Sequence, residues 1–362
     1  MGLKLHFTEQ DWERIEHDWT AWWAGELDRP MVMIEDLEPP RGVTLPEAPD
    51  FTSNLPPEMS ADEVVNRYQA QLEAKRFYGD AWPKWWPNFG PGIMAGFLGA
   101  QVHCAPDTVW FEAGEPAQAR EIQDLHPAYD AGNFWWRRIQ ELTRVAVERW
   151  GNQVSVSITD LGGNLDILAS LRTTEQLLLD LYDAPDEVAR LTSEITRLWL
   201  RYYDELYAVI QKAGRGTTPW AAIWSPGRCY MLQSDFAYMI SPRMFERFVL
   251  PDLAACCEAL DHGFYHLDGK GEIPHLDMLL SLKRLRGIQW IPGDGAPPPE
   301  EWLPLLKRIR DGGKLCQVYV SPGGARTIVR ELGGRGFALH IEQAMSRAEA
   351  EEFLRGLARE AA

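Results

Sequence analysis

The sequence predicts an α/β protein of the (β/α)8 TIM-barrel class, folded as one domain over residues 1–362. Short runs rich in Val, Ile and Tyr alternate with helical patterns along the chain, and this alternation is typical of parallel sheets. Eight such units indicate a closed barrel. Two of the runs, at Thr217 and Tyr230, lie too close together for a helix between them, so the barrel is expected to be irregular there. The predicted strands begin near Met31, Val154, Thr217, Tyr230, Gly263, Gly287, Leu315 and Phe337.

The N-terminal residues 1–75 are expected to form helices and a Pro-rich loop that pack on the barrel. Tryptophan and isoleucine recur at helical spacing between Glu9 and Glu26, directly after Thr8, which can cap the helix. A second helix is predicted from Ser60 to Phe77, because Ser60 is followed three residues later by a glutamate, the spacing of a capping box. Between the two helices, residues 39–57 are too rich in proline for regular structure.

Composition excludes several classes of protein. The 362 residues carry a net charge of -17, which argues against nucleic acid or an anionic membrane as the main partner. No apolar run reaches the length of a membrane span, and the first residues lack the apolar core of a signal peptide. The five cysteines include no CxxC pair, so we expect reduced thiols and a cytoplasmic protein.

Tryptophan is unusually abundant, with sixteen residues, and some of these rings are expected to line a cleft. The stretch from Tyr78 to Gly92 is broken by prolines and glycines, so it is predicted to be a loop. It carries Asp80, Trp85 and Trp86, which we interpret as part of a pocket wall. Simple packing of the same rings over the end of the barrel is the alternative.

The most informative stretch runs from Asp261 to Gly269, where an aromatic strand leads into a histidine and an aspartate. Side chains alternate along a strand, so His266 and Asp268 are predicted to face one way and the residues between and before them the other. A histidine beside a carboxylate at the end of a strand can form half of a metal site or an acid/base pair. The alternative is a structural histidine next to a loop aspartate.

Other polar residues also fall at the carboxyl ends of predicted strands, where the working face of a (β/α)8 barrel lies. This coincidence favours a functional site over the structural alternative. The candidate catalytic residues are His266, Asp268 and Asp235. The candidate substrate-binding residues are Asp80, Trp85, Trp86, Asp160, Asn164, Gln289 and Trp290, and the candidate metal ligands are His266, Asp268 and Glu342.

Four segments resemble the uroporphyrinogen decarboxylase superfamily. The most extensive is Gln233-Ser-Asp-Phe-Ala-Tyr-Met-Ile-Ser-Pro-Arg-Met-Phe-Glu-Arg-Phe-Val-Leu-Pro251, in which an aspartate and a Ser-Pro helix start precede the histidine-bearing strand. The others are Leu171 to Pro185, Phe89-Gly-Pro-Gly92 and Tyr265-His-Leu-Asp-Gly269. The resemblance covers most of the chain from about residue 60 and implies a (β/α)8 barrel with a funnel at its C-terminal face.

The resemblance implies one of two chemistries, and the sequence departs from both patterns. Corrinoid-dependent methyltransferases of the superfamily hold zinc with a His-x-Cys motif and a later cysteine. Here Asp268 stands where the first cysteine would be, and no cysteine follows the last predicted strand. The decarboxylases clamp their substrate with an Arg-rich N-terminal loop, whereas this chain has Glu35-Asp-Leu-Glu38 at that place, which argues against a role in haem synthesis.

We therefore expect a divergent, methyltransferase-like enzyme that acts on a small methylated or corrinoid-linked substrate. The implied cofactors are zinc and a corrinoid (cobalamin) delivered by a partner protein. Two alternatives stay open: a metal-independent lyase or decarboxylase with His266 as proton donor, and a non-catalytic binder of a corrinoid or an aromatic ligand.

Overall fold

The computed structural model describes residues 2–114 and 121–361, and its strands form the framework that positions the site. The strands are β1 (Met31–Leu37), β2 (Lys75–Gly79), β3 (Lys84–Trp85), β4 (Gln101–Ala105), β5 (Thr108–Glu112), β6 (Ser155–Val156), β7 (Cys229–Leu232), β8 (His262–Asp268), β9 (Leu285–Ile291), β10 (Leu315–Val320) and β11 (Phe337–Ile341).

The main sheet has the strand order β2-β1-β11-β10-β9-β8-β7. All of its neighbouring strands run parallel except β2, which pairs antiparallel with β1. Two smaller sheets accompany it: the parallel pair β3–β6 and the antiparallel hairpin β4–β5. Isolated bridges, Ser157 with Thr218 and Thr217 with Ser225, extend the pairing beyond β6.

These pairings correct the predicted set of strands. The predicted strand at Thr217 is only a pair of bridges, because Gly216 and Pro219 interrupt it. The strands β2, β3, β4 and β5 were not predicted, and β3 lies between two prolines in the stretch that was predicted to be a loop. Two residues suffice for its pairing with β6, and prolines at the ends of so short a strand remove no ladder bond. Among the described residues the strands fall into separate sheets rather than one closed eight-stranded ladder.

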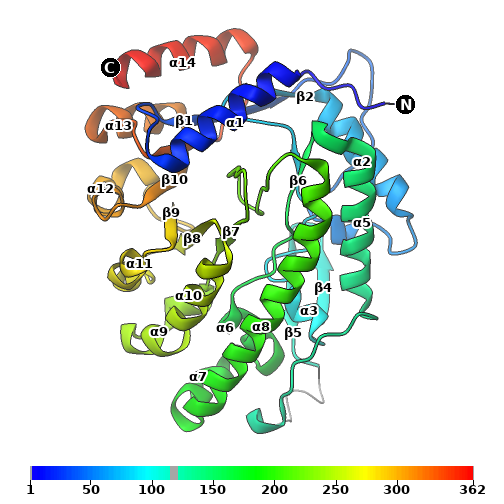
Figure 1. Cartoon of the computed structure of the whole chain (residues 1–362), viewed down its shortest axis with the longest axis vertical. Coiled ribbons are helices and arrows are strands. Elements are labelled where there is room, and N and C mark those ends of the chain that lie inside the picture. The colour runs from blue at the N-terminus through cyan, green and yellow to red at the C-terminus, as the bar shows by residue number, and fades with distance from the viewer. Residues whose placement is uncertain (1, 115–120, 362) are drawn as a thin grey trace.

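The helices lie mostly around the outside of the strands, and α9 to α13 follow β7 to β11 in an arc (Figure 1). None of the described helices is long and apolar enough to cross a membrane. The helices are α1 (Glu9–Ala24), α2 (Ala61–Ala74), α3 (Met94–Phe97), α5 (Phe134–Trp150), α6 (Asn164–Arg172), α7 (Thr174–Asp183), α8 (Pro185–Ile210), α9 (Pro242–Phe248), α10 (Leu250–Ala259), α11 (Leu276–Ser281), α12 (Leu303–Asp311), α13 (Pro322–Leu332) and α14 (Arg347–Ala361).

Helix starts follow the predicted caps. The side chains of Thr8 and Ser60 accept hydrogen bonds from the third backbone N–H of α1 and α2, and in both cases the return bond completes a capping box. The end of α2 was predicted wrongly. The helix stops at Ala74, and Lys75–Gly79 form the antiparallel edge strand β2 instead.

Strand alternation divides the interior into two hydrophobic cores. On β1, Val32 and Ile34 face outward into a large core shared with the surrounding helices, whereas Met31 and Met33 face inward. The inner core is smaller and lies at the amino ends of the strands. It contains inward residues of three further strands, namely Cys229 and Met231 of β7, Phe264 of β8 and Ala338 of β11, together with the loop residues 221–224 and the tryptophans of α1.

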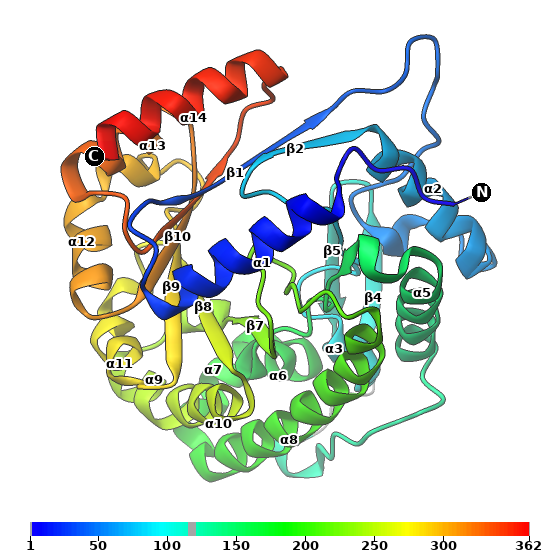
Figure 2. The same ribbon diagram turned by 45° about the horizontal axis from the view of Figure 1, so that its top comes forward.

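Helix α1 closes the amino end of the strands, and Figure 2 shows it crossing in front of them. Trp23 stacks on His262 at the start of β8, with ring centroids 4.2 Å apart, and its indole N–H donates to the carbonyl of Trp224 at 2.8 Å. Trp19 is fully buried in the same core. Among the described residues, this end of the sheet is therefore a sealed apolar floor, whereas the inward positions at the carboxyl ends include polar side chains.

Candidate functional site

His266, Asp268 and Asp235 meet at the carboxyl ends of β7 and β8. One donor atom from each of the three side chains lies within 4.8 Å of the others, and His266 Nε2 is 3.9 Å from Asp268 Oδ2. The intervening Tyr265 and Leu267 are fully buried in the outer core. The predicted alternation along β8 is thus confirmed, and His266 and Asp268 share the inner face.

A chain of amides orients the histidine. Its Nδ1–H donates to Gln289 Oε1. Gln289 Nε2 then donates to Gln317 Oε1 at 2.8 Å, and Gln317 Nε2 donates to the Ala222 carbonyl at 3.2 Å. Because that carbonyl can only accept, each amide along the chain has one orientation, and the proton of His266 is held on Nδ1. The lone pair of Nε2 is left facing Asp268, where it can bind a metal ion or accept a proton.

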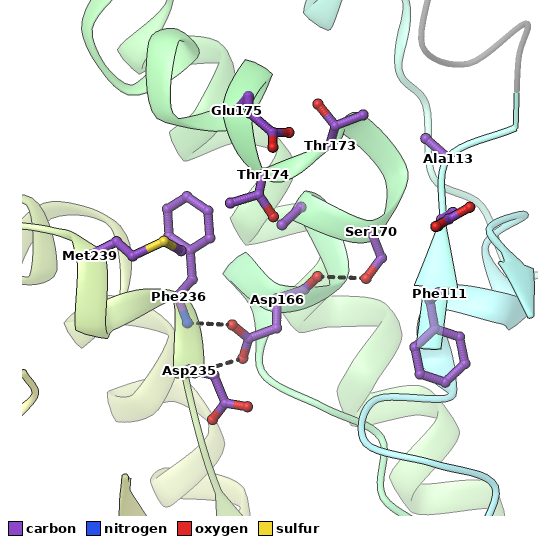
Figure 3. Close-up of a pocket in the computed structure, with 12 residues that line it drawn as sticks. Phe111, Ala113, Asp166, Ser170, Thr173, Thr174, Glu175, Asp235, Phe236 and Met239 are labelled. Carbon is purple, nitrogen blue, oxygen red and sulfur yellow. Dashed lines mark hydrogen bonds between the residues drawn. The ribbon is translucent and has the colours of Figure 1, made fainter. Parts of the chain in front are cut away.

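Buried carboxyl groups surround Asp235. Asp166 accepts the backbone N–H groups of Asp235 and Phe236 at 3.1 and 2.7 Å (Figure 3). Burial, and next the charge of Asp235, raises the pKa of Asp166. Burial likewise raises the pKa of Asp160 to about 7, with a smaller contribution from Asp235 and an opposing hydrogen bond from the Gly162 N–H. A cation placed here would relieve the mutual repulsion of these carboxylates.

A pocket of about 550 Å³ opens on the other side of Asp235. The side chain of Asp235 is exposed to solvent in this pocket. Protein nevertheless surrounds its carboxyl group on most sides, and this burial raises the pKa of Asp235. Four acidic residues and no basic one are among the lining residues, so the pocket favours cations over anions. Its lining is Phe111, Glu112, Ala113, Asp166, Ala169, Ser170, Thr173, Thr174, Glu175, Asp235, Phe236 and Met239 (Figure 3).

Two tryptophans form an aromatic wall beside the histidine. Trp220 meets the His266 ring edge-on at 5.2 Å, and Trp86 lies 6.4 Å from Trp220. The indole N–H of Trp220 donates to the Met231 carbonyl at 3.0 Å, which fixes its ring. Trp86 is one of the predicted substrate-binding residues. Trp220 was missed, and its segment, which was predicted to be a strand, is irregular in the structure.

Two other predicted wall residues face away from the site. Trp85 is 5% exposed and packs on Tyr68 and Trp150, because it follows Lys84 on β3 and so points to the opposite side from Trp86. Trp290 is fully buried against Trp302. Gln289 and Trp290 are neighbours on one strand, so only one of them could face inward.

Three further predictions are corrected by the partners of the side chains. Asp80 lies near the floor, where its buried carboxylate accepts from Arg29 at 2.7 and 2.8 Å and from the Val32 N–H. Asn164 begins α6 and binds Thr196 and Asp252 in the outer layer. Glu342 is exposed beyond β11, and the described group of side chains that could hold a metal ion contains Asp235 in its place.

Among the described residues, the site offers nitrogen and oxygen ligands and no thiolate. Of the five cysteines, four are buried elsewhere and Cys104 lies exposed on the β4–β5 hairpin. One imidazole nitrogen and two carboxylate oxygens suit Zn²⁺, Mn²⁺ or Fe²⁺, and they favour oxygen substrates over thiols. The donor set is therefore compatible with zinc, but it lacks the thiolates of the methyltransferase motif.

A second polar cluster, which the sequence did not reveal, lies on inward positions of β1, β3, β10 and β11. Glu35 pairs with Lys84 and with Lys75, the latter at 3.0 Å. His340 stacks at a tilt on Tyr319 with ring centroids 4.8 Å apart. Burial and the charge of Lys84 lower the pKa of His340 to about 4, so its ring is neutral near pH 7.

Comparison with solved structures identifies the fold. A methyltransferase from Methanosarcina mazei aligns over 96% of this chain and 98% of its own, with a TM-score of 0.62 and 13% sequence identity. No family profile matches the sequence, and no curated protein sequence matches it either. The chain therefore shares its overall fold with that methyltransferase.

Proposed function

We propose that this protein is a metal-dependent, methyltransferase-like enzyme that acts on a small methylated substrate at the carboxyl ends of β7 and β8. The convergence of Asp235, His266 and Asp268 carries the proposal. The sealed floor beneath it and the pocket beside Asp235 support a site that opens to one side only. The likeness of fold to a methyltransferase supports the reaction class.

In this proposal Asp235, His266 Nε2 and Asp268 hold the ion, which supplies Lewis acidity toward a substrate oxygen. The amide chain through Gln289 holds the histidine proton on Nδ1 and so keeps Nε2 available. Trp86 and Trp220 provide a face for a methyl or methylated cationic group. The raised pKa of Asp160 lets that carboxyl group act as a nearby proton donor near neutral pH.

In a corrinoid-linked reaction, a partner protein would carry the corrinoid to the open carboxyl end of the strands, which we call the mouth. Tyr238 and Met239, each 49% exposed, follow Asp235 in the chain and offer apolar surface for such a partner. Met239 also lines the pocket. Methyl transfer from isotope-labelled methanol, methylamines or methyl thioethers to free cobalamin would separate a corrinoid-linked reaction from one that uses another acceptor.

Metal analysis tests the proposal. Protein purified without chelator is expected to bind about one divalent ion per chain, and His266→Ala, Asp235→Asn and Asp268→Asn should each lose it. Glu342→Gln is the matched control, because it removes an exposed carboxylate near the mouth that is outside the ligand group. Equal metal content in all four variants would contradict the proposal.

The second candidate is proton transfer without a metal, as in a lyase or decarboxylase. The fixed Nδ1–H of His266 and the position of Nε2, 3.9 Å from Asp268, favour it. Protein that turns over a carboxylated substrate at full rate after exhaustive chelation, but not as His266→Gln, would support this candidate over the first.

A further inference from the structure

The inner wall at β1 and β3 is built differently from the wall that carries His266. In the main sheet, β11, β10 and β9 separate β1 from β8. Glu35, Lys84 and His340 occupy inward positions here, and their side chains are only partly buried. The two walls therefore face the same mouth with different side chains.

Positive charge exceeds negative charge in this cluster. Lys84 and Lys75 share the single carboxylate of Glu35, whose pKa they lower against the effect of burial. His340 is neutral near pH 7, as described above, so it adds no charge. The side chains of Lys84 and Glu35 are 17% and 16% exposed, so water screens the excess charge only in part.

The wall also contains polar atoms without partners. Trp86 lies two residues after Lys84 and faces the same way. Its indole N–H is buried and has no hydrogen-bond partner among the described residues, and the same is true of His340 Nδ1. Below Lys84, Trp82 is fully buried, and the ammonium lies 4.9 Å above its ring. A donor-only indole N–H next to a lysine is suited to an anionic oxygen.

We propose that Lys84 and the Trp86 indole N–H bind a carboxylate group of the substrate, which thus spans the mouth from this wall to the Asp235–His266–Asp268 group. This inference rests on the proposed function and names its substrate class: a small molecule with a carboxylate at one end and the reacting group at the other. Trp220 lies between the two ends, in contact with both Trp86 and His266.

A purely structural role for Lys84 makes a different prediction. If the Lys84–Glu35 pair only ties β3 to β1, its loss should lower stability and leave small-molecule binding unchanged. Binding of simple carboxylates can therefore be measured without knowledge of the natural substrate. The probes are acetate, propionate and succinate, each compared with its neutral amide by calorimetry on the full-length protein.

The wild-type protein is expected to bind at least one of the acids with a roughly millimolar Kd and its amide much more weakly. Lys84→Met should weaken that binding about tenfold or more, and Lys84→Arg should restore most of it. Lys75→Met is the matched control, because it removes the other partner of Glu35 and leaves Lys84 in place.

Equal binding of acids and amides, unchanged binding in folded Lys84→Met, or no acid bound at all would each overturn the proposal. His266→Ala should still bind the acid, since the two walls are separate. The two proposals can fail separately: wild-type protein that binds the acid but no metal contradicts only the first, and wild-type protein that binds a metal but no acid contradicts only the second.

Discussion

The inward-facing positions of the strands carry apolar side chains at the amino ends and polar side chains at the carboxyl ends. At the amino ends these positions hold Met31, Met33 and Phe264, and α1 seals them with fully buried tryptophan. A few residues further along the same strands, the inward positions hold Glu35, His266 and Asp268. The comparison teaches that polar inward side chains gather at the carboxyl ends, because buried apolar side chains fill the inward positions at the amino ends.

The largest expected effect is on the floor. Trp19→Ala removes a fully buried ring and should lower the free energy of unfolding by about 3–5 kcal/mol. Denaturant unfolding measures this loss. The metal content per folded chain should not change, since none of the three proposed metal ligands lies in the floor. Trp110→Ala, on a side chain that is 42% exposed, is the control and should cost less than about 1 kcal/mol; equal losses would mean that the floor is not the better packed region.

The next largest effect is expected at the mouth, on metal affinity, from the side chain of Gln289, which is not itself a proposed metal ligand. Gln289→Leu removes the acceptor that fixes the His266 proton and should weaken metal binding about 10–100-fold. Titration against a chelating dye measures the affinity. Gln289→Glu retains an acceptor oxygen and should lose less. Unchanged affinity in Gln289→Leu would show that the amide chain does not position the histidine.

Asp252 lies outside both the floor and the mouth, and it tests whether a buried carboxyl group can be accommodated without a neighbouring cation. Its partners among the described residues are neutral, and they include the Thr196 hydroxyl at 2.9 Å. Burial raises the pKa of Asp252 to about 7. Because the folded protein holds this proton more tightly than the unfolded chain, the stabilising contribution is complete below about pH 4 and is lost as the pH rises through about 7.

Asp252→Asn should remove this dependence. Between pH 5 and pH 8, the change in the free energy of unfolding should be smaller in the variant by about 2–3 kcal/mol. Chemical unfolding at the two pH values measures it. The same pH dependence in both proteins would mean that Asp252 is ionised when folded and has a cationic partner.

The smallest expected change in the free energy of unfolding comes from a surface ion pair, and it is the reference for the larger changes. Arg144 and Glu148 form an exposed pair on α5 at 3.0 Å. Glu148→Ala should change the free energy of unfolding by less than about 0.5 kcal/mol. A larger change, measured by the same denaturant unfolding, would mean that surface pairs contribute enough to obscure the contrast between floor and mouth.

Local patterns predicted much of the framework. An N-cap residue, Thr8, and a capping box at Ser60 located the starts of α1 and α2, and alternation placed His266 and Asp268 on one face of β8. Alternation applied to β9 would also have excluded Trp290 once Gln289 was chosen. These successes share one cause, because each depends on neighbours within a few residues along the chain.

The rest depended on partners that are distant in sequence. Nothing near Asp80 indicates that Arg29 neutralises it, and nothing near Asn164 indicates Asp252. The brief strand β3, hidden between prolines, decides that Trp86 and Lys84 face the mouth while Trp85 faces the core. The wall at β1 and β3 was missed because β3 was predicted to be a loop.

The most direct test is the position of a bound ion. Crystals of the protein grown with Zn²⁺ or Mn²⁺ should give an anomalous diffraction peak about 2.0–2.3 Å from His266 Nε2 and from one oxygen each of Asp235 and Asp268. A peak at another place, or none at saturating metal, would contradict the assignment of these three side chains as a metal site.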